Sequence, residues 1–327
     1  MPRGQAAPMS LDLAAIRAAH DRIRAHVTRT PVLTNARLDA ACGGRLFFKC
    51  DNLQKAGAFK ARGAANAVFS LGETEAARGV ATHSSGNHAA ALARAAKLRG
   101  IPAHIVMPRN AARPKVRMVE GYGGRLTFCE PTQEARERAC AAILSTTGAN
   151  LVHPFEDERV MAGQGTAAVE FLEEVPDLDA VLCPVGGGGL LAGTAVAVRA
   201  LRPAAQVIGT EPAGADDAAR SFRGTTRVPM TDPRTIADGL RTTIGEPNLA
   251  LARRHVHDIV TVSEAGIIAA MRLLFEALKV VVEPSAAVPY AALMEGRVPA
   301  AGRRIGIILS GGNVDLDLPL PWTQASR

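Results

Sequence analysis

The chain carries the stretch AVLCPVGGGGLLAGT at residues 180–194, in which an apolar run leads through four consecutive glycines into the start of a helix. A strand, a glycine loop and a helix N-terminus in this order form a cradle for an anion such as phosphate. Only glycine lets several successive N–H groups converge on one phosphate without a Cβ in the way. We therefore predict a phosphate site at Gly186, Gly187, Gly188 and Gly189, with Leu190 opening the helix that follows.

Strands and helices alternate on both sides of this stretch. The hydrophobic pattern predicts strands near residues 46–50, 79–82, 103–107, 125–128, 180–183, 206–210 and 305–309. Helices are expected near residues 11–26, 62–71, 87–99, 114–122, 133–146, 162–174 and 191–201. This βαβ alternation is typical of α/β proteins with parallel strands, whose ligands bind at the carboxyl ends of the strands.

The second informative stretch is QKAGAFKARG at residues 54–63, which contains Lys60. The chain has only six lysines, and its other positive side chains are arginines, so Lys60 is a candidate for a task that arginine cannot perform. A lysine amine condenses with an aldehyde to form a Schiff base. A reactive lysine together with a phosphate cradle indicates pyridoxal phosphate as the cofactor.

Two further strand ends carry polar side chains and glycines. The sequence HSSGNH follows the strand near residue 80, and SGGN follows the strand near residue 307. The first could be an ordinary helix cap, worth about 1 kcal/mol. Placed at a helix N-terminus, it could equally bind an anion such as a substrate carboxylate. In the second, the Ser310 hydroxyl could meet a ring nitrogen.

Composition excludes several classes of protein. The 47% hydrophobic content over 327 residues is that of a globular protein, and we expect neither a secretory signal nor a membrane span. Five scattered cysteines argue against a disulfide framework and a zinc cluster, so a cytoplasmic location is expected. The formal charge of +7 is spread without a basic run, and aromatics are scarce, so we expect no nucleic-acid partner.

The motifs AFKARG, SSGNH, GGGG and SGGN together resemble the serine/threonine dehydratase and serine racemase group of fold type II pyridoxal phosphate enzymes. The resemblance covers nearly the whole chain. It implies an α/β protein of the tryptophan synthase β-like architecture, with two open twisted-sheet lobes. Residues 1–52 and 154–327 would form the large cofactor-binding domain, and residues 53–153 the small domain that closes over the substrate. A homodimer is also implied.

The resemblance assigns roles to the cofactor residues. Lys60 would hold pyridoxal phosphate covalently and act as a base at the substrate α carbon, with Phe59 flanking the ring. Asn87 would bond the phenolic oxygen, the four glycines the phosphate, and Ser310 the pyridine nitrogen. A neutral serine partner does not force the ring nitrogen to stay protonated, which suits β-elimination.

The resemblance also assigns the substrate residues and a metal. The substrate carboxylate would be bound by Ser84, Ser85, Asn87 and His88, with Arg136 and Asp238 near the far end of the substrate. A divalent cation would be held by Glu211, the Ala215 carbonyl and Asp217. These hard oxygen ligands suit Mg²⁺, with Ca²⁺ or Mn²⁺ as alternatives.

The expected reaction is the conversion of a small β-hydroxy amino acid to a 2-oxo acid and ammonia. Threonine, serine and 3-hydroxyaspartate remain candidate substrates, and Arg136 and Arg241 favour an acidic one. The alternative is a serine or aspartate-type racemase, in which Ser85 would act as a second base opposite Lys60. A β-replacing synthase would show an asparagine-containing loop in place of Ala61 to Gly63, and a non-catalytic binding protein would not need Lys60.

Overall fold

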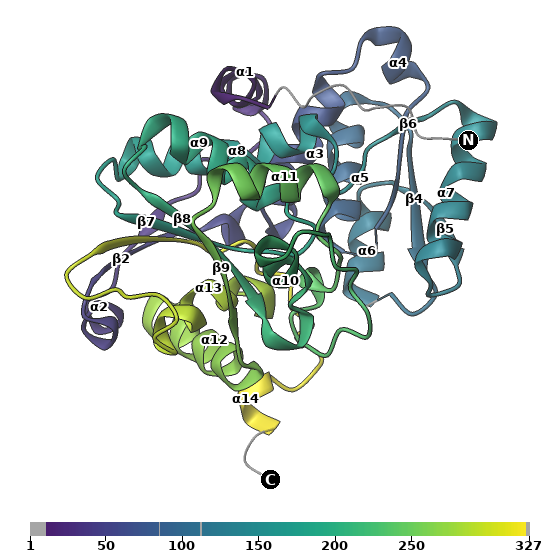
Figure 1. The fold of residues 1–327 in the computed structure, drawn as a ribbon. Helices are drawn as coiled ribbons and strands as arrows, with labels where there is room; N and C mark the ends of the chain where they lie inside the picture. Colours follow the sequence, from purple (N-terminus) through teal and green to yellow (C-terminus); the bar gives the residue numbers. More distant parts are fainter. Residues whose placement is uncertain (1–10, 85, 112, 325–327) are drawn as a thin grey trace.

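The strands form two separate sheets (Figure 1). This computed structural model describes residues 11–84, 86–111 and 113–324. The larger sheet has the strand order β1 (Val32–Leu33), β2 (Arg45–Lys49), β10 (Arg304–Ile308), β7 (Ala180–Pro184), β8 (Gln206–Pro212) and β9 (Asp258–Val262). The smaller sheet has the order β5 (Arg125–Cys129), β4 (Ala103–Pro108), β3 (Val80–His83) and β6 (Asn150–Leu151). The predicted α/β architecture with two sheets is confirmed.

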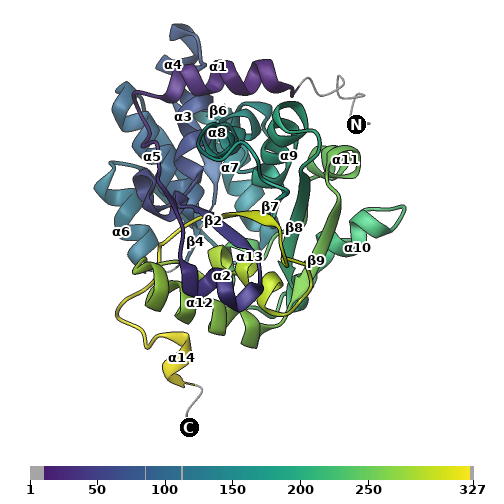
Figure 2. The same ribbon diagram turned by 90° about the vertical axis from the view of Figure 1, so that its left-hand side faces the viewer.

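Helices cover both faces of the larger sheet, as Figure 2 shows. One face packs on α1 (Leu13–Ile23), α8 (Glu158–Glu174), α9 (Gly189–Leu201) and α11 (Glu246–His255). The other packs on α2 (Ala36–Cys42), α12 (Glu264–Leu278) and α13 (Pro284–Met294). Because both faces are covered, every residue of β7 is buried, which explains why this strand is a continuous apolar run rather than an alternating one.

The smaller sheet is covered in the same way. One apolar core joins it to α3 (Lys60–Phe69), α5 (Asn87–Arg99) and α6 (Arg113–Gly121), and a smaller core joins its other face to α7 (Gln133–Thr147). The alanine-rich helix α5 is largely buried from His88 to Ala96, where its small side chains let α3 approach closely, and its last turn is exposed. It ends at Gly100, whose left-handed φ of 72° favours glycine.

The remaining elements are short. They are the helices α4 (Glu73–Ala77), α10 (Asp217–Arg223) and α14 (Pro321–Gln324), and the 3₁₀ turns η1 (Asp51–Leu53), η2 (Lys55–Gly57), η3 (Ala213–Ala215) and η4 (Asp238–Leu240). In the part of the chain that the structure describes, no helix has the length and apolar character of a membrane span.

The structure differs from the sequence prediction at the edges of the larger sheet. The predicted strands pair in parallel with one another, as expected. The edge strand β1 was not predicted, and it pairs antiparallel with β2 through Val32 and Lys49. This strand has only two residues, too few for a hydrophobic pattern to show. The other edge strand, β9, was not predicted. Only Ile259 and Val262 of its five residues are buried, and its sequence is neither a continuous apolar run nor a strict alternation.

Candidate active site

Lys60 is the first residue of α3. This helix packs in the core of the smaller sheet and also contacts α8, which covers the larger sheet. The Lys60 Nζ donates to the Pro154 carbonyl at 2.7 Å and lies 5.0 Å from the centre of the Phe59 ring. Burial lowers the pKa of the Lys60 amine to about 8, although the Glu283 carboxylate acts in the opposite direction. A larger fraction of this amine is therefore neutral, and so nucleophilic, than for an exposed lysine.

A buried ion cluster fixes the helix that carries Lys60. Arg62 is fully buried and donates in pairs to Asp51, at 2.7 and 2.9 Å, and to Glu170, at 2.7 and 2.8 Å. Lys49 donates to the same Glu170 at 2.7 Å. Planar forked pairing holds a guanidinium in one orientation. The first turn of α3 is thus anchored to β2, η1 and α8.

The glycine loop has no room for side chains. A Cβ on Gly187 would lie 2.2 Å from the Phe155 ring, and one on Gly186 would lie 3.0 Å from the Gly239 carbonyl oxygen. Gly188 has a φ of +87°, which strongly favours glycine. The loop ends at the N-terminus of α9, whose first N–H groups have no partner within the helix. These features fit a phosphate cradle, and Leu190 is buried behind it.

The glycine loop and Lys60 both contact the same short segment, Pro154 and Phe155. Pro154 accepts the hydrogen bond from Lys60, and the next residue, Phe155, packs its ring against Gly187. A ligand bearing an aldehyde at one end and a phosphate at the other could therefore reach both groups.

Asn87 and Ser310 complete the surroundings of Lys60. The Asn87 amide donates to both oxygens of Glu283, at 2.9 and 3.0 Å, and its Oδ1 accepts from Asn313 at 3.0 Å. Ser310 is buried, and its carbonyl accepts from the Phe59 N–H at 2.9 Å. The sequence-predicted residues Phe59, Lys60, Asn87 and Ser310 are thus brought together by contacts between segments far apart in the chain.

Glu283 is a site residue that sequence reasoning missed. It precedes α13 and is buried, and burial raises its pKa to about 7, while the hydrogen bond from Asn87 acts to lower it. Its sequence signal was the Glu283-Pro284 pair at a helix start, which carries no functional meaning without knowledge of its neighbours.

The predicted substrate residues lie on several elements. Ser84 accepts from the Gly86 N–H at 3.3 Å, and His88 is buried with its Nε2 3.2 Å from the Val152 carbonyl oxygen. Ser85 lies outside the described residues. Arg136 lies on α7, where its charge lowers the pKa of His83 in addition to the larger effect of burial. Asp238 forms an ion pair with Lys115 of α6.

The predicted metal ligands are grouped around the end of β8. Glu211 accepts from the Ala218 and Ala219 N–H groups at 3.2 and 2.8 Å, and Asp217 accepts from the Ile244 N–H at 2.8 Å. Burial raises the pKa of Asp217 to about 6 and that of Glu211 well above its usual value. Ala215 is buried beside them in η3.

One oxygen of this carboxylate pair is available to a cation. The second oxygen of Asp217 has no hydrogen-bond partner among the described residues, and an unpaired buried carboxylate oxygen suits a cation. The described residues contain no group of three or more His, Cys, Asp or Glu side chains placed around one metal position. The site would therefore need backbone carbonyl or water ligands as well.

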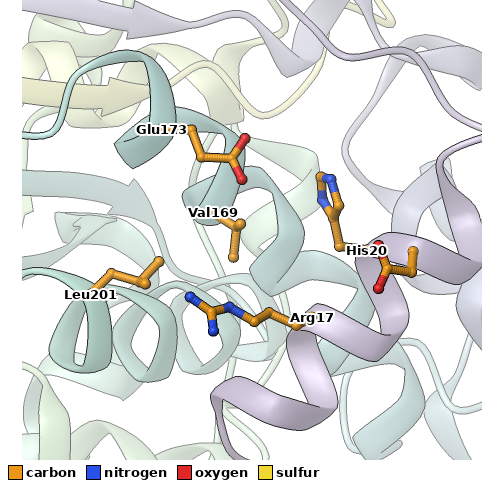
Figure 3. Close-up of a pocket in the computed structure, with 6 residues that line it drawn as sticks. Arg17, His20, Val169, Glu173 and Leu201 are labelled. Atoms are coloured by element: carbon orange, nitrogen blue, oxygen red, sulfur yellow. The ribbon is translucent and has the colours of Figure 1, made fainter.

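A separate cavity of about 250 Å³ opens on the surface between α1, α8 and α9. Figure 3 shows Arg17 and His20 of α1 facing Val169 and Glu173 of α8, with Leu201 at the side. Its lining contains none of the predicted site residues, and its charges are mixed, so we assign it no ligand.

The fold and the site define a class of protein. The chain belongs to the pyridoxal-phosphate dependent enzyme family, whose model matches residues 23–311. It is 49% identical to the beta-hydroxyaspartate dehydratase of Paracoccus denitrificans, over 93% of this chain and 96% of the relative. It is 48% identical to the serine racemase of Arabidopsis thaliana, over 93% of each chain or more. The solved structure of maize serine racemase superimposes with a TM-score of 0.93, at 45% identity and 97% coverage of both chains.

Proposed function

We propose that this protein is a pyridoxal phosphate-dependent ammonia-lyase that eliminates water from a small β-hydroxy amino acid. Hydrolysis of the resulting imino acid adds one water back and releases ammonia and a 2-oxo acid. The observation that carries this proposal is Lys60, an amine with a pKa of about 8 that is joined through Pro154 and Phe155 to a glycine loop suited to phosphate. The similarity to a beta-hydroxyaspartate dehydratase supports 3-hydroxyaspartate as the preferred substrate, ahead of threonine and serine.

Each cofactor contact has a candidate residue. Lys60 would bind the aldehyde carbon, Gly186 to Gly189 the phosphate, and Asn87 the phenolic oxygen, while the Ser310 hydroxyl would face the ring nitrogen. When bound, pyridoxal phosphate supplies an acceptor for the electrons left on the substrate α carbon after its proton is removed.

The chain's own groups would move the protons. We propose that Lys60 Nζ would take the α proton of the bound amino acid, a role that its lowered pKa suits near neutral pH. Glu283 sits near this amine and holds Asn87 in place, so its charge helps to set the pKa of Lys60. The β-hydroxyl would leave as water, and the proton that it takes up balances the one that Lys60 removes from the α carbon.

Substrate binding would use the N-terminus of α5. We propose that the segment from Ser84 to His88 binds the α-carboxylate, with His88 supporting the wall of the site through its contact with Val152. Arg136, whose charge acts on His83, is the proposed partner of an acidic side chain. Asp238 would act through its ion pair with Lys115, which joins α6 to η4.

Racemization is a second candidate function, because the relatives include serine racemases at 48% and 45% identity. It would require a second base on the face of the substrate opposite Lys60, and Ser85 is our proposal for that base. Its neighbours Ser84 and Gly86 precede Asn87, the first residue of α5, so Ser85 belongs to the segment that we assign to the substrate.

We further propose a divalent cation, Mg²⁺ or else Ca²⁺ or Mn²⁺, at Glu211, Asp217 and the Ala215 carbonyl. The raised pKa of both carboxyl groups indicates that, without a cation, the charged pair is unfavourable in its buried position. A bound cation would stabilise both carboxylates and the start of α10, whose first residue is Asp217.

We also propose a closing movement of one domain, a homodimer and a cytoplasmic location. Residues 53–153, which include all four strands of the smaller sheet, would form a domain that closes over the substrate and excludes water. The protein would act as a cytoplasmic homodimer. The side chains of Leu53 and Val281, 49% and 41% exposed on adjoining segments, are candidates for burial between subunits.

The test is a comparison of kcat/KM for 2-oxo acid release from the 3-hydroxyaspartate stereoisomers, L-threonine and L-serine, with pyridoxal phosphate and Mg²⁺ present. Chiral chromatography of the remaining substrate measures inversion at the α carbon. Oxo acid release faster than inversion supports the ammonia-lyase. Inversion faster than release would make the protein a racemase, and equal values for all substrates would remove the preference for an acidic side chain.

A further inference from the structure

Asn248 connects two parts of the site that are distant in sequence. It lies in the first turns of α11, which packs on α9 (Figure 1), and its side chain is fully buried. Its Nδ2 donates to the Phe155 carbonyl at 2.9 Å and also to the Gly187 carbonyl. One carboxamide therefore joins the segment that follows Pro154 to the glycine loop.

Both segments carry groups of the proposed site. Pro154 accepts the hydrogen bond from Lys60 Nζ, and the Phe155 ring lies against Gly187. Asn248 also fits closely beneath the loop, because a Cβ on Gly188 would lie 2.8 Å from the Asn248 Cβ. Moving either segment would break one of the two hydrogen bonds.

The turn that leads into α11 is itself fixed. The Ile244 N–H donates to Asp217 at 2.8 Å, the Ile244 carbonyl accepts from Arg227 at 3.1 Å, and the Gly245 N–H donates to the Gly187 carbonyl at 3.1 Å. Asn248 is therefore attached to a well-anchored part of the larger body and can hold the loop against it.

A cofactor that is bound at its aldehyde and at its phosphate needs a fixed distance between the two attachment points. We propose that Asn248 is a positioning residue that sets the glycine loop relative to Pro154 and Lys60, and so sets the affinity for the cofactor's phosphate without touching the cofactor. This inference rests on the proposed assignment of the phosphate to Gly186–Gly189.

The test compares two ligands that differ only in the phosphate. Apoenzyme of the wild type and of Asn248→Ala is titrated with pyridoxal phosphate and with pyridoxal, and each Kd is measured by absorbance of the bound ligand. Losing the bridge should raise the Kd for pyridoxal phosphate about tenfold. The Kd for pyridoxal should change less than about twofold, because that ligand is held at Lys60 alone.

Asn150→Ala is the matched control. The Asn150 amide also bridges two backbone carbonyls, those of Glu75 at 2.7 Å and Gly79 at 2.9 Å, but it lies in the smaller sheet away from the glycine loop. This variant should leave both Kd values unchanged. Should the alanine variant of Asn248 fail to fold, Asn248→Ser gives the same test, because a hydroxyl can donate to only one carbonyl at a time.

The outcomes separate this inference from the proposed function. An equal rise in both Kd values for the Asn248 variant, or no rise in either, would overturn the positioning role. A wild type that binds pyridoxal as tightly as pyridoxal phosphate would overturn the phosphate assignment, and the inference would fall with it. Only a selective loss of pyridoxal phosphate affinity supports the role.

Discussion

Replacing Arg62 with methionine should destabilise the protein strongly. Arg62 makes four short hydrogen bonds to Asp51 and Glu170, all within the buried interior. With Lys49 included, the cluster holds two positive and two negative charges, so its net charge is zero. Removing one positive charge leaves a net charge of −1 among buried groups.

Breaking a buried ion pair by removing one partner costs about 3–5 kcal/mol, against a typical total stability of about 5–15 kcal/mol. We expect Arg62→Met to lower the free energy of unfolding by an amount in this range. Arg62→Lys should lower it less, because lysine keeps the positive charge and loses only the forked geometry. The measurement is urea unfolding of the apoenzyme, followed by far-UV circular dichroism. Arg138→Met is the control, since the pair of Arg138 with Glu134 is exposed and should contribute at most about 0.5 kcal/mol.

The pH dependence gives an independent check of the same cluster. Burial acts to raise the pKa of Glu170, but its hydrogen bonds and its attraction to Arg62 and Lys49 outweigh this effect and lower it overall. A lowered carboxyl pKa stabilises the fold above the unfolded pKa, and the contribution is lost as pH falls through the folded value. The deficit of Arg62→Met should therefore shrink on acidification. This account would be refuted if Arg62→Met lost no more free energy of unfolding than Arg138→Met. It would also be refuted if the loss in Arg62→Met did not change with pH.

Three further predictions concern the site. The rate at which apoenzyme captures pyridoxal phosphate should rise with pH through about 8 as Lys60 loses its proton; Glu283→Gln should move this midpoint to lower pH, and an unchanged midpoint would contradict the coupling. Asp217→Asn should abolish the rise in Tm produced by Mg²⁺ while leaving the apoenzyme Tm similar, whereas an undiminished rise would place the cation elsewhere. Ser85→Ala should eliminate inversion at the α carbon and retain 2-oxo acid release, so persistent inversion would exclude Ser85 as the second base.

The parts of the site that the sequence predicts are those whose signal is local. The glycine loop follows its strand directly, and Lys60 stands out because lysine is rare in this chain. The helix bounds were predicted closely where glycine and polar residues flank an apolar run, as in α5, which spans residues 87–99 as expected. Local chemistry was enough for these elements.

The parts that could not be predicted depend on contacts between distant segments. Lys60 meets Pro154 across 94 residues, and Asn87 meets Glu283 across 196. No periodicity or motif in one sequence shows that a particular backbone carbonyl will accept from Lys60, or that Asn248 will bridge two loops. The edge strand β1 was missed because its local signal is too short, since two residues cannot show a hydrophobic pattern.

The most direct test of the proposed chemistry is the release of 2-oxo acid and ammonia from 3-hydroxyaspartate by the wild type and by Lys60→Ala, both loaded with pyridoxal phosphate. The account predicts equal amounts of the two products from the wild type and a rate at least about 10²-fold lower in the variant. Release that persists in the variant, or a wild type that yields no oxo acid from any β-hydroxy amino acid, would contradict it.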